Sequence, residues 1–179
     1  MCSQDAPSVF LESSRLCTRR LTLVPFSLDL LRLALAHNRD ALEERLSARV
    51  LPRWAADGER FLSDAIQVLE ADPASWPWRA YLIMHTTDRA VIGSAGFKGP
   101  PDRDGTVEIG YGIVPEYRRQ GYTFEAVQAL VGWAFGHPEV KRITAQCDDS
   151  NAGSIRILEK LGMHRTGRTR RMLSWELPR

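Results

Sequence analysis

The sequence has few cysteines and no long apolar run, and these shortages exclude several classes of protein. Its three cysteines, Cys2, Cys17 and Cys147, are odd in number and have no metal-ligand spacing. They disfavour a disulfide framework and favour a reducing compartment. No apolar run approaches the roughly 18 residues that a membrane-spanning helix needs, and the first ten residues show no secretory-signal pattern. We therefore expect a cytoplasmic protein with no membrane partner.

An excess of charge of one sign is also missing. The 24 basic and 22 acidic residues leave a net charge of +2, which is too small to indicate a direct nucleic-acid partner. Only three of the basic residues are lysine, and 21 are arginine. This excess has two interpretations: a coding bias, or a surface that binds phosphate and carboxylate through the guanidinium fork. The histidines have no metal-ligand spacing either, so we expect no metal.

The length and composition indicate one globular domain covering residues 1–179. Hydrophobic residues make up 44% and charged residues 26% of the chain, values near the globular average, so we expect no disorder. A chain of 179 residues is long enough to bury a substantial core. We find no internal repeat, low-complexity tract or linker that would divide it.

Hydrophobic periodicity predicts an α+β fold with a mixed sheet. The predicted order of elements is β-α-α-α-β-β-β-α-β-α-β-β, and Ser27 or Asp29 is expected to cap the first helix. The expected strands cover residues 21–23, 80–84, 90–97, 107–114, 140–147, 163–168 and 170–177. The expected helices cover residues 28–35, 41–50, 59–71, 121–134 and a segment after residue 151.

The segment from Val107 to Ala126 is the most informative about function. Its first half alternates apolar residues with Glu108 and two glycines, which is the two-residue period of a strand. From Gly121 onward the apolar residues follow the period of a helix. The turn between them therefore brings two arginines and a glycine to the first free N–H groups of that helix. Such a turn predicts an anion site, most naturally for phosphate.

Three segments resemble the GCN5-related N-acetyltransferase (GNAT) superfamily. Residues 118–123 resemble its R/Q-x-x-G-x-G/A signature, with Thr123 where a glycine or alanine is usual. Residues 151–163 resemble its N-x-x-S-x-x-x-L-E-K-x-G-F segment. Residues 18–23 resemble the T-E-R-L-x-L opening strand of its Rim-type branch, which acetylates the N-termini of ribosomal proteins. The resemblance runs from about residue 16 to the end.

The resemblance implies a fold, a reaction and a set of cofactor-binding residues. The fold is the GNAT fold, a mostly antiparallel sheet of about seven strands flanked by helices. The reaction is direct transfer of an acetyl group from acetyl-CoA, as cosubstrate, to an amine. In the family, backbone N–H groups of the turn hold the pyrophosphate, and the pantetheine lies along the preceding strand edge. The residues implied to contact the cofactor are Ile113, Val114, Arg118, Arg119, Gln120, Gly121, Tyr122, Thr123 and Asn151.

Glu108 is the predicted general base, because the strand alternation places it beside the two glycines. The alternative is an exposed carboxylate or a structural ion pair. The required base strength depends on the acceptor: at pH 7 an α-amine of pKa ~7.8 costs about 1 kcal/mol to deprotonate, and a lysine of pKa ~10.4 about 4.6 kcal/mol. A carboxylate acting through water is sufficient for an α-amine. The pattern therefore favours an acceptor with a low pKa, either a peptide N-terminus or a small-molecule amine.

The donor of a proton to the departing thiolate is harder to assign. Many relatives have a tyrosine seven residues after the asparagine of the second segment, and this chain has Leu158 there. The Rim-type pattern implies Ser154 instead, as the second catalytic residue. Asn151 and Ser154 also fit a helix N-terminus whose side chains satisfy free N–H groups. If Leu158 marks lost catalysis, the chain is a non-catalytic acyl-CoA-binding module.

The acceptor site is predicted to lie between the first two helices and the hairpin loops. Tryptophans at positions 54, 76 and 78 are candidates to line it, although tryptophan is more often a core residue. Arginines at 165, 168, 170 and 171 predict a solvated turn or, alternatively, a surface that attracts an acidic peptide or a ribosome. A ribosome- or RNA-binding role resting on the arginine excess ranks last. We expect a monomer or a homodimer.

Overall fold

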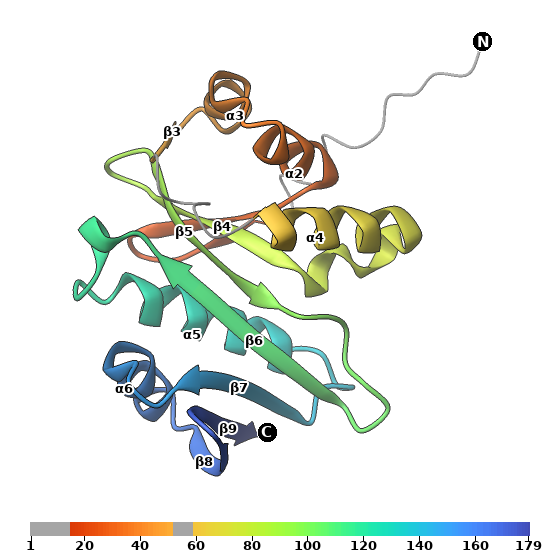
Figure 1. Cartoon of the computed structure of the whole chain (residues 1–179), viewed down its shortest axis with the longest axis vertical. Helices are drawn as coiled ribbons and strands as arrows, with labels where there is room; N and C mark the ends of the chain where they lie inside the picture. Colours follow the sequence, from red (N-terminus) through yellow and green to blue (C-terminus); the bar gives the residue numbers. More distant parts are fainter. Residues whose placement is uncertain (1–14, 52–58) are drawn as a thin grey trace.

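The computed structural model describes residues 15–51 and 59–179, which form one nine-stranded sheet with helices on both faces (Figure 1). The order of strands is β1-β2-β4-β5-β6-β7-β9-β8, and β3 pairs in parallel with β5. The strands are β1 (Leu16–Cys17), β2 (Leu21–Pro25), β3 (Arg49–Val50), β4 (Ala80–His85), β5 (Ala90–Phe97), β6 (Thr106–Ile113), β7 (Arg142–Asp148), β8 (His164–Thr169) and β9 (Met172–Pro178). The helices are α2 (Leu28–Leu35), α3 (Arg39–Leu46), α4 (Glu59–Ala71), α5 (Tyr122–Phe135) and α6 (Ala152–Lys160), with short 3-10 turns at η1 (Pro73–Trp78) and η2 (Pro115–Tyr117).

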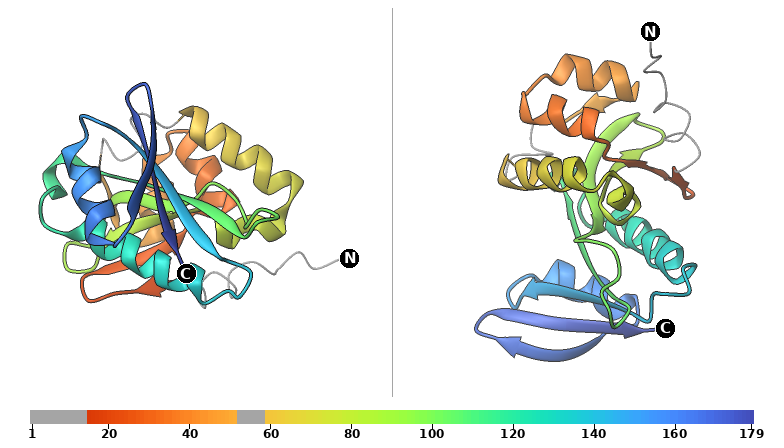
Figure 2. Two further views of the ribbon diagram at one scale, coloured as in Figure 1. Left: turned by 90° about the horizontal axis from the view of Figure 1, so that it is seen from below. Right: turned by 90° about the vertical axis from the view of Figure 1, so that its right-hand side faces the viewer.

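Two hydrophobic clusters cover the two faces of the sheet. On β4, Leu82 faces the cluster formed with α2, α3 and α4, whereas Tyr81 and Ile83 face the cluster formed with α5. This is the alternation of side chains that a strand requires. The right-hand view of Figure 2 shows the green central strands between α2, α3 and α4 on one side and α5 on the other. The predicted α+β fold is confirmed.

Local signals explain most of the element boundaries. Ser27 caps α2, since its hydroxyl accepts a hydrogen bond from the N–H of Leu30. The predicted helix over residues 41–50 is wrong in its second half, because α3 ends at Leu46. Ser47 has a left-handed φ of 48°, which terminates the helix, and Val50 pairs with Val91 of β5. The sheet therefore gains a strand that the helical pattern concealed.

The pairing of β6 with β7 is short, so the two strands separate beyond it. The two strands are parallel, and their ladder covers only Thr106–Glu108 of β6 against Arg142–Thr144 of β7. Beyond Glu108 the edge of β6 that faces β7 leaves the ladder, while its other edge stays paired with β5 as far as Ile113. The two halves of the sheet therefore separate toward the end of β6. Within the described ranges, no helix is long and apolar enough to span a membrane.

Candidate cofactor and active site

The turn between β6 and α5 has the backbone geometry of an anion site. Arg119 and Gly121 both adopt left-handed φ angles, of 61° and 83°, which turn the chain sharply into α5. Gly121 occupies the N-cap position, and no side chain caps the helix. The first N–H groups of this 14-residue helix are therefore available to a ligand, at the positive end of the helix dipole.

A cavity of about 760 Å³ opens beside this turn, between the end of β6 and the first turns of α5 and α6. Four cationic residues line it, Arg118, Arg119, Arg156 and Lys160, and none of its described lining residues is Asp or Glu. Lys160 lies 4.0 Å from the ring centroid of Phe124, which also lines the cavity. An excess of four positive charges at an uncapped helix N-terminus fits the phosphates of coenzyme A.

The structure brings most of the predicted cofactor residues to this cavity. Three predicted residues lie elsewhere. Val114 is buried in the core and donates its N–H to Ile92, Gln120 donates its side-chain amide to the carbonyl of Glu116, and Glu108 is not among the lining residues. The predicted residues that do line the cavity are Ile113, Arg118, Arg119, Gly121, Tyr122, Thr123, Asn151 and Ser154.

Arg20 connects the loop before β2 to the turn and to α5, a role for which the sequence has no local signal. Its Nε forms a 2.7 Å ion pair with Glu125 of α5, and its Nη1 donates to the carbonyl of Gln120 at 3.0 Å. The guanidinium also lies 4.4 Å from the ring centroid of Tyr122. Thr18 donates its hydroxyl to the other oxygen of Glu125 at 2.7 Å. The loop between β1 and β2 therefore holds the turn and the start of α5 in place.

The N-terminus of α6 forms the opposite wall of the cavity. Asn151 caps α6, because its side-chain oxygen accepts from the N–H of Ser154 at 3.0 Å. The hydroxyl of Ser154 lies 2.8 Å from the hydroxyl of Tyr111 on β6. Leu158 is fully buried in the core and is absent from the cavity lining. Two hydroxyl groups therefore meet in the cavity on the side of Tyr111, away from the turn.

Comparisons with known proteins agree with this geometry. Residues 20–164 match the family model of the acetyltransferase (GNAT) domain. The uncharacterized N-acetyltransferase YjdG of Bacillus subtilis is 33% identical over 146 residues, which cover 81% of this chain and 86% of that protein. This chain belongs to the GNAT acetyltransferase family. Membership confirms the prediction of an N-acetyltransferase that uses acetyl-CoA as its acetyl donor.

Solved structures of GNAT acetyltransferases share the fold. The ribosomal-protein-S5-alanine acetyltransferase of Vibrio fischeri superposes with a TM-score of 0.65 at 14% identity, over 92% of this chain and 96% of that one. RimL, a ribosomal L7/L12 α-N-protein acetyltransferase solved in complex with coenzyme A, superposes with a TM-score of 0.66 at 14% identity, over 92% and 97%. At this identity the likeness shows the fold alone.

In this GNAT protein, Glu108 lies on the face of β6 away from the core helix α5. Its neighbours on the strand, Val107 and Ile109, are buried on the α5 side. The carboxylate forms an ion pair with Lys98, and its side chain is 27% exposed. The structure thus shows the ion pair that was the alternative interpretation of Glu108. The Glu108 side chain also remains accessible to solvent. Its role as base stays a prediction.

None of the tryptophans predicted for the acceptor site lines the cofactor cavity. Trp78 is buried and packs against Phe97 and Trp133 in the core next to α5. Trp76 is half-buried against the cluster on the other face of the sheet. Trp54 lies outside the described residues. The two described tryptophans follow the more common pattern for this residue type, which is core packing.

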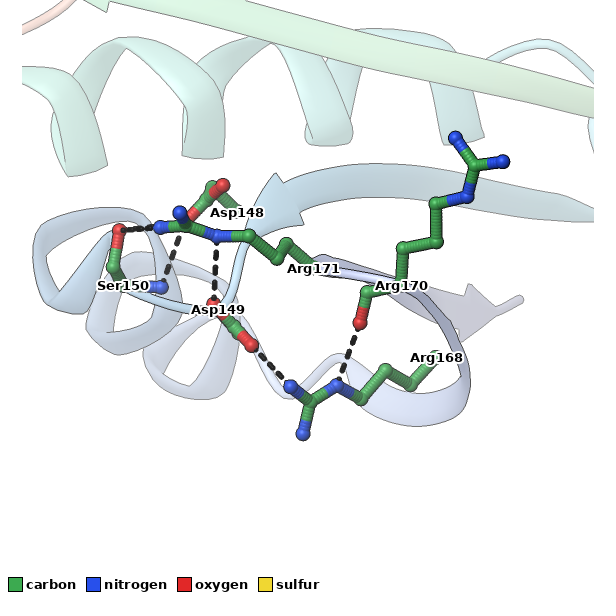
Figure 3. A network of polar contacts seen from close by, with 6 residues as sticks. All are labelled: Asp148, Asp149, Ser150, Arg168, Arg170 and Arg171. Carbon is green, nitrogen blue, oxygen red and sulfur yellow. Dashed lines mark hydrogen bonds and ion pairs between the residues drawn. The ribbon is translucent and has the colours of Figure 1, made fainter.

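Two of the four arginines of the β8–β9 hairpin, Arg168 and Arg171, form ion pairs with the loop before α6 (Figure 3). Arg168 pairs with Asp149, and Arg171 pairs with Asp148 at 3.2 Å and Asp149 at 3.7 Å. The guanidinium of Arg170 points away from this network in Figure 3. All these pairs are largely exposed, so each contributes little to stability. Their effect is to connect the hairpin to the segment that leads into the cavity wall.

Variants of Asn151 separate its helix-capping role from its predicted cofactor contact. Replacement by alanine removes the cap, so we expect a loss of about 1 kcal/mol in the free energy of unfolding. Replacement by aspartate keeps a cap acceptor and adds a negative charge to a cavity with a net positive lining. We expect Asn151→Asp to unfold like the wild type but to bind coenzyme A about 10-fold more weakly. Urea denaturation and calorimetric titration measure the two effects, and wild-type affinity in Asn151→Asp would remove Asn151 from the cofactor site.

The ion pair of Glu125 predicts a specific pH dependence of stability. Burial raises the pKa of Glu125, but hydrogen bonds from Thr18 and Arg20 outweigh it, so the pKa lies below its ordinary 4.5. A carboxylate with a lowered folded-state pKa contributes stability above its unfolded-state pKa and loses it as the pH falls through the folded-state pKa.

We therefore expect Glu125→Gln to lose about 1–2 kcal/mol of unfolding free energy at neutral pH. Its stability should also decline less steeply than that of the wild type below about pH 4.5. Urea unfolding at a series of pH values checks this. The exposed Glu159 on α6 supplies the control, Glu159→Gln, which should follow the wild-type curve. Parallel pH curves for Glu125→Gln and the wild type would contradict the prediction.

Proposed function

We propose that this acetyltransferase acts on an amine of low pKa, in the first place the α-amine of a peptide N-terminus. The observation that carries the proposal is the absence of a carboxylate among the described lining residues of the cavity, together with the ion pair between Glu108 and Lys98. A strong base near the reacting atoms is what a lysine acceptor needs. The Glu108 carboxylate is instead engaged in an ion pair with Lys98.

Proton energetics favour the same acceptor class. At pH 7 an α-amine of pKa ~7.8 needs about 1 kcal/mol to become neutral, while a lysine of pKa ~10.4 needs about 4.6 kcal/mol. Glu108 acting through one water provides the small assistance that an α-amine requires. Named neighbours in the same fold act on ribosomal proteins, which is consistent with a peptide N-terminus. Small amines of comparable pKa form the alternative within the same chemistry.

In this proposal, each wall of the cavity has one task. The N–H groups at the start of α5, between Arg119 and Thr123, bind the pyrophosphate of acetyl-CoA, and the cationic side chains of α6 neutralise its remaining phosphate. The edge of β6 that leaves the ladder after Glu108 pairs with the pantetheine. The acetyl group then lies between Glu108 on one side of β6 and Ser154 on the other. We propose that the protein acts as a monomer or a homodimer.

Acetyl-CoA-dependent thiol release tests the proposal with a matched panel of acceptors. The panel contains peptides with a free N-terminus, the same peptides with a blocked N-terminus and one lysine, and small amines. We expect release with the first group, a mass gain of one acetyl group at the N-terminus, and up to about 10-fold slower turnover in Glu108→Gln at pH 7. Release with lysine peptides alone would contradict the proposed acceptor. Coenzyme A binding without release from any acceptor would instead indicate a non-catalytic module.

A further inference from the structure

Transfer of the acetyl group creates a thiolate on coenzyme A, and this thiolate needs a proton. Six of the described residues that line the cavity have a hydroxyl group: Tyr111, Tyr117, Tyr122, Thr123, Ser150 and Ser154. Histidine and protonated carboxyl groups are absent from the described lining. The proton donor at the reacting end is therefore to be found among these hydroxyl groups.

Four of the six hydroxyl groups either donate to other partners or lie at the end of the cavity next to the phosphate turn. Tyr117 donates to Asp88 at 2.6 Å, and Ser150 donates to Asp148 at 2.5 Å. Tyr122 and Thr123 begin α5, at the turn proposed to hold the pyrophosphate. Only the pair of Tyr111 and Ser154 remains, and Tyr111 is the lining residue of β6 farthest from the turn.

We propose that Tyr111 is the catalytic residue that protonates the coenzyme A thiolate, with Ser154 relaying a proton to it. The inference rests on the proposed acetyl transfer at this site. Of the two hydroxyl groups, the phenol is the acid whose ordinary pKa, about 10, is close to that of a thiol, about 8.5. Burial raises the pKa of Tyr111, while its hydrogen bond with Ser154 lowers it and the Cys147 thiol on β7 adds a smaller rise, so the phenol is protonated at neutral pH.

The step is balanced in atoms and charge. The lone pair of the acceptor nitrogen attacks the acetyl carbonyl carbon, the C–N bond forms, and the C–S bond breaks with its electron pair going to sulfur. The hydroxyl of Tyr111 gives its proton to the sulfur. The phenolate takes a proton from the hydroxyl of Ser154, which is replenished by water from the open cavity. The surplus proton of the acceptor nitrogen leaves to Glu108 through water, and its release to solvent neutralises the hydroxide that is left when water replenishes Ser154.

This assignment also accounts for Leu158. A hydroxyl group at position 158 would be in the core, because Leu158 is fully buried and is absent from the cavity lining. A donor on β6 replaces a donor on α6, and the 2.8 Å contact to Ser154 orients it from across the cavity. Loss of the usual tyrosine is thus compatible with retained catalysis.

Two measurements on Tyr111→Phe test the proposal, with Tyr81→Phe as the control. Tyr81 is buried outside the cavity and donates its hydroxyl to Pro77, so its variant removes a buried hydroxyl remote from the reaction. The first measurement is kcat with the best acceptor, which we expect to fall about 100-fold or more in Tyr111→Phe. The dissociation constant for coenzyme A should stay within about threefold of wild type. Wild-type kcat in Tyr111→Phe would overturn the proposal.

The second measurement needs no acceptor and so separates this proposal from the proposed function. The ultraviolet absorbance of the thiolate reports the pKa of the bound coenzyme A thiol. A hydrogen bond from Tyr111 stabilises the thiolate, so we expect a lower thiol pKa in the wild type and in Tyr81→Phe than in Tyr111→Phe. Equal thiol pKa values in wild type and Tyr111→Phe would overturn the assignment of Tyr111. If the thiol pKa is lower in the wild type than in Tyr111→Phe but the wild type acetylates no acceptor, the contact between Tyr111 and the sulfur is supported and the proposed function is rejected.

Discussion

Valine in place of Gly121 will abolish tight binding of coenzyme A without unfolding the protein. Gly121 has a φ of 83°, and a Cβ there would lie 3.4 Å from a guanidinium nitrogen of Arg20. A left-handed conformation costs an L-residue roughly 1–2 kcal/mol, and more when the side chain is β-branched. Relief of this strain rotates the peptide groups of the turn and displaces the N–H groups that are proposed to meet the pyrophosphate.

We expect the dissociation constant for coenzyme A to rise on the order of 100-fold in Gly121→Val, measured by calorimetry. Gly132→Ala is the matched control on the same helix. Gly132 is exposed within α5, and a Cβ there meets nothing within 4 Å. Alanine there should bind coenzyme A normally and add about 0.5–1 kcal/mol of stability. Wild-type affinity in Gly121→Val would exclude this turn as the phosphate site.

Alanine at Gly93 should cause a large loss of stability. Gly93 on β5 pairs with Ile113 on β6, and a Cβ would lie 2.2 Å from the carbonyl oxygen of Gly112 and 2.9 Å from the Cα of Ile113. Both contacts are with backbone atoms, which cannot move aside without separating β5 from β6. Because β6 leads into the phosphate turn, the same displacement affects the cofactor site.

We expect Gly93→Ala to lose about 3 kcal/mol or more of unfolding free energy, which lowers Tm by about 2–4 °C per kcal/mol in a domain of this size. Gly110→Ala on β6 is the control, since a Cβ there meets nothing within 4 Å. Its unfolding free energy should stay within about 1 kcal/mol of wild type. Thermal and urea denaturation of the wild type, Gly93→Ala and Gly110→Ala measure these losses. A loss below about 1 kcal/mol in Gly93→Ala would show that β5 and β6 are not packed as described.

Features with a local periodic signal were predictable from the sequence. The strand, turn and helix between Val107 and Ala126 appear in the structure as β6, the turn and α5, and most of the predicted cofactor residues line one cavity. The strands that were missed, β1 and β3, have two residues each, too few for any period to be visible. The sheet accordingly has nine strands where about seven were expected.

Features that depend on distant residues were not predictable from local patterns. The hydrogen bond between Tyr111 and Ser154 joins residues 43 positions apart, and the ion pair between Arg20 and Glu125 joins residues 105 positions apart. Arg156 and Lys160 did have a local signal, because a spacing of four places both on one face of α6. The resemblance of that segment drew attention to Asn151 and Ser154, and the two cations beyond them were overlooked.

The most direct test of the account is a crystal structure with bound coenzyme A. We expect the pyrophosphate on the N–H groups between Arg119 and Thr123, the pantetheine along β6, and the sulfur within hydrogen-bonding distance of the Tyr111 hydroxyl. Density for coenzyme A at any other surface would contradict the cofactor site. A sulfur remote from both Tyr111 and Ser154 would contradict the proposed route of the proton.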